Sequence, residues 1–287
     1  MLKDYRAYSA AELELQYETD GEKPDSVDFV RAYERDSAVI RGSRPARLDV
    51  AYGPLPAENM DIFTTSAPNA PVFVFIHGGY WKGGKKEFRA FLAPAYTDAG
   101  AVYISLEYPL TPDVTLDRLV AAVRSGIAWI WKNAASFGGD PSRIHVCGNS
   151  AGGHLIGMLM APGWKEALGM PESAIAGGCA ISGLFELTPL QPLSYNGWLK
   201  LDDAGIAKNS PIRHLPPKGR PLIVTLGADE SDEFLRQSRD YAAAWIARGF
   251  PLVYLEVPGT QHFSIVGEIG RAGSPLRSAI FHQMGLG

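Results

Sequence analysis

A serine at position 150 lies in a pattern suited to nucleophilic chemistry. It stands between two glycines in Gly148-x-Ser150-x-Gly152, after an apolar run (143–147) and before an apolar helical stretch (153–160). Glycines at these positions leave room for a sharp strand-to-helix turn that raises the serine hydroxyl above a sheet. The N–H groups and the dipole of the following helix would point to the same place. We therefore predict that Ser150 is a nucleophile.

A serine nucleophile requires a base, because its hydroxyl is unreactive at neutral pH, and histidine has the appropriate pKa. Of the six histidines, only His262 follows a late apolar run (252–257) through a short turn. The chain order serine, acid, histidine places the base of such a site there. We predict His262 as the base. Of the other histidines near the motifs, His77 and His145 are interpreted as structural residues, and His154, one turn past the serine, as a residue that packs in the core or supports the site from behind.

A glycine pair marks a second functional loop. His77-Gly78-Gly79 follows directly on the apolar run 72–76 and is continued by Tyr80. Such a pair lets the backbone curl, so that the N–H groups of Gly79 and Tyr80 face a cavity. Together with the N–H of Ala151, they would form an oxyanion hole with three donors.

The acid that orients His262 is less well defined. The apolar run 222–226 leads into a turn that carries four carboxylates. Asp232 and Glu233 suit the first turn of the following helix, where acids complement the dipole. Asp229 and Glu230 remain as candidates, and their spacing does not decide between them.

These residues require a sheet that brings them together. Two alternating runs (47–52 and 60–64) precede a series of short apolar runs, and helical stretches are expected at 10–17, 28–35, 116–133 and 232–248. Strands that are apolar throughout are typical of a parallel sheet covered on both faces. We predict an α/β fold with a mostly parallel sheet in a single domain, residues 1–287. The stretch 183–217 is predicted as a lid or pocket wall. The apolar runs are 72–76, 101–106, 143–147, 174–181, 222–226 and 252–257.

Composition excludes several classes of function. The 287 residues contain 27 Lys and Arg against 31 Asp and Glu, so neither nucleic acid nor an anionic membrane is an expected partner. No apolar run approaches the length of a membrane helix and no secretory signal is visible, which predicts a soluble, cytoplasmic protein. The two cysteines, Cys147 and Cys179, form neither a disulfide framework nor a zinc site, and no spacing indicates a metal or other cofactor.

The two Gly-rich motifs resemble the kynurenine formamidase (arylformamidase) branch of the α/β-hydrolase superfamily, close to the hormone-sensitive-lipase-like esterases. The resemblance rests on His77-Gly78-Gly79-Tyr80-Trp81 and on the segment from Gly148 to His154, with supporting pieces along most of the chain. It implies an α/β-hydrolase fold with Ser150 as nucleophile, His262 as base and Gly78, Gly79 and Tyr80 in the oxyanion loop. The acid of the family corresponds in position to Glu230, and the resemblance therefore favours Glu230 over Asp229. The residue type departs from the animal formamidases, which have aspartate at this position.

The resemblance further implies hydrolysis of a small amide or ester through an acyl-enzyme, with an arylformamide of the N-formylkynurenine type as the expected substrate. A short-acyl carboxylesterase is the alternative within this class, and a non-catalytic binding protein with the same fold is the alternative outside it. An aromatic substrate would need an aromatic pocket, and the oligomeric state, a dimer included, is left open. The candidate pocket residues are Tyr80, Trp81, Tyr195, Trp198 and Phe263.

Overall fold

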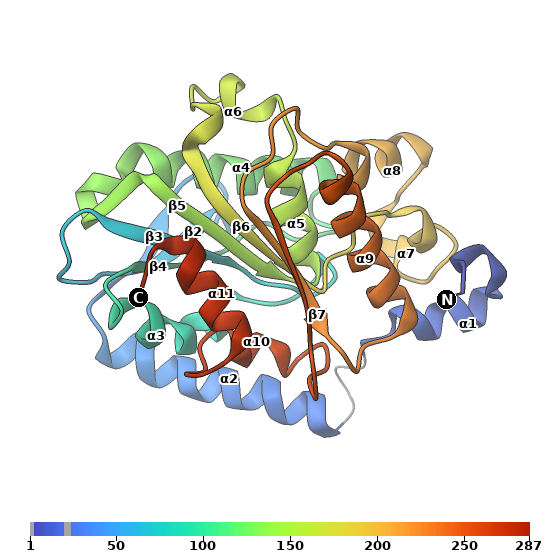
Figure 1. The fold of residues 1–287 in the computed structure, drawn as a ribbon, viewed down its shortest axis with the longest axis horizontal. Helices are drawn as coiled ribbons and strands as arrows, with labels where there is room; N and C mark the ends of the chain where they lie inside the picture. Colours follow the sequence, from blue (N-terminus) through green and yellow to red (C-terminus); the bar gives the residue numbers. More distant parts are fainter. Residues whose placement is uncertain (1–2, 20–23) are drawn as a thin grey trace.

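The computed structural model describes residues 3–19 and 24–287, and a sheet of eight strands lies at its centre (Figure 1). The strands are hydrogen-bonded in the order β1-β2-β4-β3-β5-β6-β7-β8. Each predicted run overlaps one of them. The strands are β1 (Ala46–Ala51), β2 (Asn59–Phe63), β3 (Ala70–Ile76), β4 (Val102–Leu106), β5 (Gly139–Asn149), β6 (Ile175–Ile181), β7 (Leu222–Gly227) and β8 (Leu252–Val257).

The direction of the strands confirms the predicted sheet. Strand β2 is antiparallel to both of its neighbours, β1 and β4. Every other pairing, from β4 across to β8, is parallel. The carboxyl ends of β3, β5, β6, β7 and β8 therefore meet at one edge, which is where ligands bind in open α/β sheets.

Helices cover both faces of the sheet (Figure 1). The helices expected at 10–17, 116–133 and 232–248 are present, and the one expected at 28–35 is the middle of a helix of 20 residues. The helices are α1 (Ala10–Tyr17), α2 (Pro24–Ser43), α3 (Ala93–Thr97), α4 (Leu116–Asn133), α5 (Ala151–Met160), α6 (Trp164–Ala167), α7 (Asn196–Leu199), α8 (Asp203–Asn209), α9 (Asp232–Ala247), α10 (Ile265–Glu268) and α11 (Pro275–Met284). Short 3₁₀ helices occur at η1 (Tyr5–Ala7), η2 (Lys86–Leu92), η3 (Ala134–Phe137), η4 (Glu172–Ala174), η5 (Thr188–Leu190) and η6 (Pro211–Arg213).

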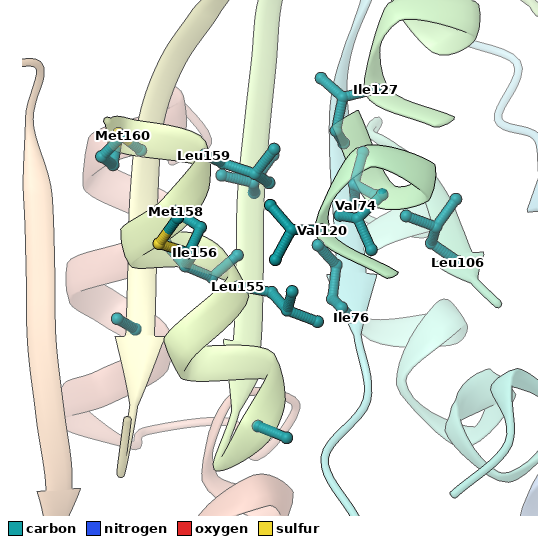
Figure 2. Packing of buried hydrophobic residues seen from close by; sticks show 14 of the residues in the cluster. Val74, Ile76, Leu106, Val120, Ile127, Leu155, Ile156, Met158, Leu159 and Met160 are labelled. Carbon is teal, nitrogen blue, oxygen red and sulfur yellow. The ribbon is translucent and has the colours of Figure 1, made fainter. Parts of the chain in front are cut away.

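Strand β3 is apolar throughout because its two faces pack into different cores. Val74 and Ile76 belong to one core, which includes side chains of α4 and α5. Phe73 and Phe75 belong to the other, beneath α3, α10 and α11. Figure 2 shows the first of these cores, where Val120 of α4 lies between Leu155 and Leu159 of α5 and the side chains of Val74 and Ile76 on β3. Packing in this core fixes the position of α5, and with it the turn before the helix, which carries Ser150.

The stretch 183–217 is short helices and turns that pack against the body of the protein. Its apolar side chains Leu184, Phe185, Leu187 and Leu190 are fully buried. Tyr195 and Trp198, by contrast, are only half-buried. Within residues 3–19 and 24–287, no helix has the length and apolar character needed to cross a membrane.

Candidate active site

Ser150 occupies a strained turn between β5 and α5. Its φ of 57° and ψ of −119° lie where side chains other than glycine are rarely found. The glycines around it explain how so tight a turn is built. A Cβ at Gly148 would lie 2.6 Å from the carbonyl oxygen of Gly152, and one at Gly153 would lie 2.6 Å from that of Ile181. The predicted strand-turn-helix around Ser150 is present, and the side chain is 3% exposed.

The tightest of these contacts leads to a stability prediction. A Cβ at Gly152 would lie 2.1 Å from the carbonyl oxygen of Ile76, and neither backbone can move without disturbing β3 or α5. We expect Gly152→Ala to lower the free energy of unfolding by about 3 kcal/mol or more, the upper part of the range for overpacking. Gly197→Ala is the control, because nothing lies within 4 Å of a Cβ there. Equal stability of the two variants in urea unfolding would contradict the close approach.

The loop after β3 lies against the serine, as predicted. A Cβ at Gly78 would lie 2.9 Å from Cβ of Ser150, so only glycine fits this position. Gly79 has a φ of 123° and Tyr80 a φ of 47°, which curl the backbone. The N–H groups of Gly79, Tyr80 and Ala151 donate no hydrogen bond to the part of the chain that the structure describes. These donors are therefore available to a ligand.

His262 and Glu230 lie together in the loops after β8 and β7. Their contact is a hydrogen bond of 2.6 Å between Nδ1 of His262 and Oε2 of Glu230. The other carboxylate oxygen, Oε1, accepts hydrogen bonds from the hydroxyl of Ser182 at 2.6 Å and from the N–H of Gly227 at 2.7 Å. The carboxylate is thus fully occupied, with its side chain 2% exposed, and holds the imidazole through Nδ1.

The competing acid, Asp229, is placed differently. Its side chain is exposed, and within residues 3–19 and 24–287 only its backbone N–H is bonded, to the carbonyl of Thr260 at 3.0 Å. Of the two candidates, the structure therefore brings only Glu230 into contact with His262. Ser182, whose hydroxyl supports Glu230, was not among the predicted site residues. A serine at the end of an apolar strand gives no signal in the sequence that it serves a carboxylate at the end of the next strand.

Two other histidines have structural surroundings, as predicted. Nε2 of His77 lies 2.7 Å from Oε1 of Glu107, and Nδ1 lies 2.8 Å from the carbonyl of Gly78. The ring also stacks on Tyr108 with 4.3 Å between the ring centres. Burial raises the pKa of Glu107, but its contact with His77 and the hydrogen bonds from the N–H groups of Lys86 and Tyr108 outweigh burial, so the pKa is lowered. His145, within β5, is buried, and this burial lowers its pKa to about 4.

The predicted pocket aromatics contact the loop after β3 or His262, but none of the five lines the cavity that opens beside His262. Tyr80 and Tyr195 stack with 4.3 Å between ring centres, and the indole N–H of Trp198 donates to the carbonyl of Tyr80 at 3.2 Å. Phe263 packs edge-to-face on His262 at 5.7 Å. Trp81 differs from the prediction. Its side chain is fully buried, so it lies beneath the loop and presents no surface to a pocket.

Helix α1 contributes to the site in a way that the sequence motifs do not indicate. The carbonyl of Tyr17, its last residue, accepts hydrogen bonds from the hydroxyls of both Tyr80 and Tyr195. The hydroxyl of Tyr17 donates to Glu233 at 2.7 Å. Glu233 lies in the first turn of α9, as expected, but it is fully buried and paired at two points with Arg236. Burial of this carboxylate is tolerated because the Arg236 guanidinium pairs with both of its oxygens.

A cavity of about 290 Å³ opens beside His262. Leu15 of α1 and Thr19, two residues after the end of that helix, contribute to its lining, and α9 supplies Phe234, whose ring lies 4.7 Å from the His262 ring. The walls thus combine apolar and polar side chains, as ligand pockets commonly do. Within the described residues, no group of three or more His, Cys, Asp or Glu side chains is arranged to hold a metal ion.

The sequence and the fold are similar to those of known hydrolases. The family model BD-FAE matches residues 60–169, which include the loop after β3 and the Ser150 turn. Kynurenine formamidase of Danio rerio is 30% identical over 283 residues, 93% of this chain and 94% of that protein. Esterase LipQ of Mycobacterium tuberculosis is 29% identical over 240 residues, 75% of this chain and 56% of that protein. A solved structure from Silicibacter sp. TM1040 has a TM-score of 0.82 at 26% identity and covers 94% of this chain and 98% of its own.

The similarity to the formamidase extends over nearly the whole chain. The sheet order and the structural match confirm the α/β-hydrolase fold expected from the resemblance. The protein is therefore an enzyme that hydrolyses amides or esters. By its sequence, the chain belongs to the kynurenine formamidase family of the α/β-hydrolase superfamily.

Proposed function

We propose that the protein is a serine hydrolase with Ser150, His262 and Glu230 as its catalytic triad. The observation that carries this proposal is the 2.6 Å bond from Nδ1 of His262 to a buried Glu230, at the sheet edge where Ser150 stands in a strained turn. Hydrogen bonds also connect Ser150 to Glu230 across neighbouring strands. The N–H of Ser150 donates to Ile181 at 2.8 Å, and the next residue, Ser182, donates to Glu230 at 2.6 Å.

The proposed reaction has two halves. Oγ of Ser150 attacks the carbonyl carbon while its proton passes to Nε2 of His262, and the N–H groups of Gly79, Tyr80 and Ala151 stabilise the oxyanion. Collapse breaks the bond to the leaving group, which takes the proton from His262, and an acyl-enzyme remains. Water then loses a proton to the same nitrogen, attacks the ester and releases the acid with free Ser150. Glu230 holds the proton on Nδ1 throughout, so that Nε2 is free at the start of each half.

We propose an arylformamide of the N-formylkynurenine type as the substrate. Three features support this choice: the formamidase relative, the small exposed fraction of Ser150 and the aromatic residues around the site. A serine that is 3% exposed favours a small acyl group such as formyl. The cavity of about 290 Å³ lies on the His262 side of the site, and its lining includes neither Ser150 nor the loop after β3, so we assign it to the leaving group alone. The stretch 183–217 would supply a wall through Tyr195 and Trp198.

A short-acyl carboxylesterase is the second candidate, supported by the similarity to Esterase LipQ. The deciding experiment measures kcat/KM for N-formylkynurenine and for p-nitrophenyl acetate on one preparation of the enzyme. We expect a value near or above ~10⁴ M⁻¹s⁻¹ for the formamide. Fast ester cleavage with little formamide turnover would favour the esterase instead. Failure of a fluorophosphonate to label the folded protein would contradict serine catalysis and favour a binding protein.

A further inference from the structure

The loop that carries two of the oxyanion donors is held in an unusual backbone conformation. Tyr80 and Trp81 are consecutive non-glycine residues with φ of 47° and 55°. The left-handed region is unfavourable for such residues, so a loop of this kind persists only where its surroundings impose it. The carbonyl of Trp81 is one fixed point, since it accepts bonds from the N–H and the hydroxyl of Thr111 at 2.7 and 2.9 Å.

The indole of Trp81 is the second fixed point, and it is held by His154. The indole N–H donates to Nδ1 of His154 at 3.1 Å, and the two rings are perpendicular with 4.9 Å between their centres. Nε2 of His154 lies 2.7 Å from the carbonyl oxygen of Asn209. An indole N–H only donates and a carbonyl only accepts, so the proton of the neutral ring is on Nε2 and the lone pair of Nδ1 faces Trp81.

His154 keeps this arrangement over a wide range of pH. Its side chain is fully buried, and burial lowers its pKa to about 4. The groups around it consist of the indole, the Asn209 carbonyl and, further away, the Arg124 guanidinium, whose positive charge also disfavours the imidazolium. Near neutral pH, Nδ1 is therefore an acceptor, and His154 takes no part in proton transfer.

We propose that His154 is a positioning residue that aligns the two halves of the oxyanion hole, an inference that rests on the serine-hydrolase site proposed above. His154 is on α5, and its N–H donates to the carbonyl of Ser150 at 3.0 Å. The helix that presents Ser150 and the N–H of Ala151 thus also holds Trp81, and through Trp81 the N–H of Tyr80. One residue thus connects the two halves: its backbone is bonded to Ser150 at the start of α5, and its side chain holds the loop that supplies the other donors.

The test compares His154→Leu, which fills similar space without an acceptor, with His154→Asn, whose Oδ1 lies close to the position of Nδ1. We expect His154→Leu to lower kcat about 10- to 100-fold, less than the loss of a whole donor, with KM changed less than about threefold. Ki of a trifluoromethyl ketone, which forms a hemiketal oxyanion on the serine, should rise by a similar factor. His154→Asn should recover most of both losses.

Two further variants keep the test decisive if His154→Leu does not fold. Trp81→Phe removes the indole N–H and keeps an aromatic ring, and we expect it to lower kcat as His154→Leu does. His145→Leu is the control, because His145 is also a buried histidine but lies within β5 beside Phe73, three residues before the end of β3. It should keep kcat. A folded Trp81→Phe with wild-type kcat and wild-type Ki would overturn the inference, while the serine-hydrolase assignment would stand. Wild-type enzyme without serine-dependent turnover would instead overturn the assignment itself.

Discussion

Replacing Ser150 with alanine is expected to reduce kcat for any substrate by ~10⁴-fold or more, with the fold intact. The reason is that a methyl side chain leaves no oxygen to form the acyl-enzyme, while the oxyanion donors and His262 alone give only a small residual rate. The variant should also lose all labelling by a fluorophosphonate. The measurements are kcat/KM on N-formylkynurenine and p-nitrophenyl acetate, and labelling followed by mass spectrometry.

The control for this prediction is Ser66→Ala. Ser66 is exposed in the connection before β3, at the edge of the sheet away from the site, and its replacement should leave kcat unchanged. The backbone strain at Ser150 is tested separately, by comparing the stabilities of Ser150→Ala and Ser150→Gly. Alanine relieves none of the strain at a φ of 57°. Glycine adopts positive φ without a steric cost, so Ser150→Gly should raise the free energy of unfolding by about 1 kcal/mol. Undiminished turnover by Ser150→Ala would place the nucleophile elsewhere.

The sequence predicted most of the sheet and the Ser150 turn because both depend on local patterns. A short apolar run next to turn residues indicates a buried strand, and the glycines after the run at 143–147 indicate a turn. Each of the six apolar runs corresponds to one strand, from β3 to β8. The helices α10 and α11 were missed: α10 has only four residues, too few to show a helical period, whereas Leu276, Ile280 and Met284 of α11 do have helical spacing that was overlooked.

Contacts between segments far apart in the chain were less predictable. Trp81 was expected in the pocket because aromatic residues near a catalytic loop often line one, yet its indole N–H found a buried partner 73 residues away, in His154. Tyr17 reaches Glu233 across 216 residues. No local pattern specifies either contact, since each depends on how α1, α5 and α9 pack. The choice between Asp229 and Glu230 was of the same kind, because adjacent residues in a turn point in different directions.

That choice gives the second large effect: Glu230→Gln should lower kcat about 10³- to 10⁴-fold. The N–H of Gly227 only donates, and it lies 2.7 Å from Oε1 of Glu230. In the glutamine variant the side-chain oxygen must take this position, so the amide NH₂ faces Nδ1 of His262. Nδ1 must then accept, which moves the imidazole proton to Nε2, the atom that has to receive the proton of Ser150. The ring stays in place but carries its proton on the wrong nitrogen.

Asp229→Asn is the matched control, because it makes the same change one residue earlier on an exposed side chain. We expect its kcat to stay within about threefold of wild type, since only the backbone of Asp229 is bonded to the protein around it. Glu230→Asp tests reach separately: it keeps the charge but retracts it by one methylene, so part of the activity should be lost even though the tautomer is preserved. If Asp229→Asn were the more damaging of the two amide variants, the acid of the triad would be Asp229, and the 2.6 Å contact of Glu230 would be structural only.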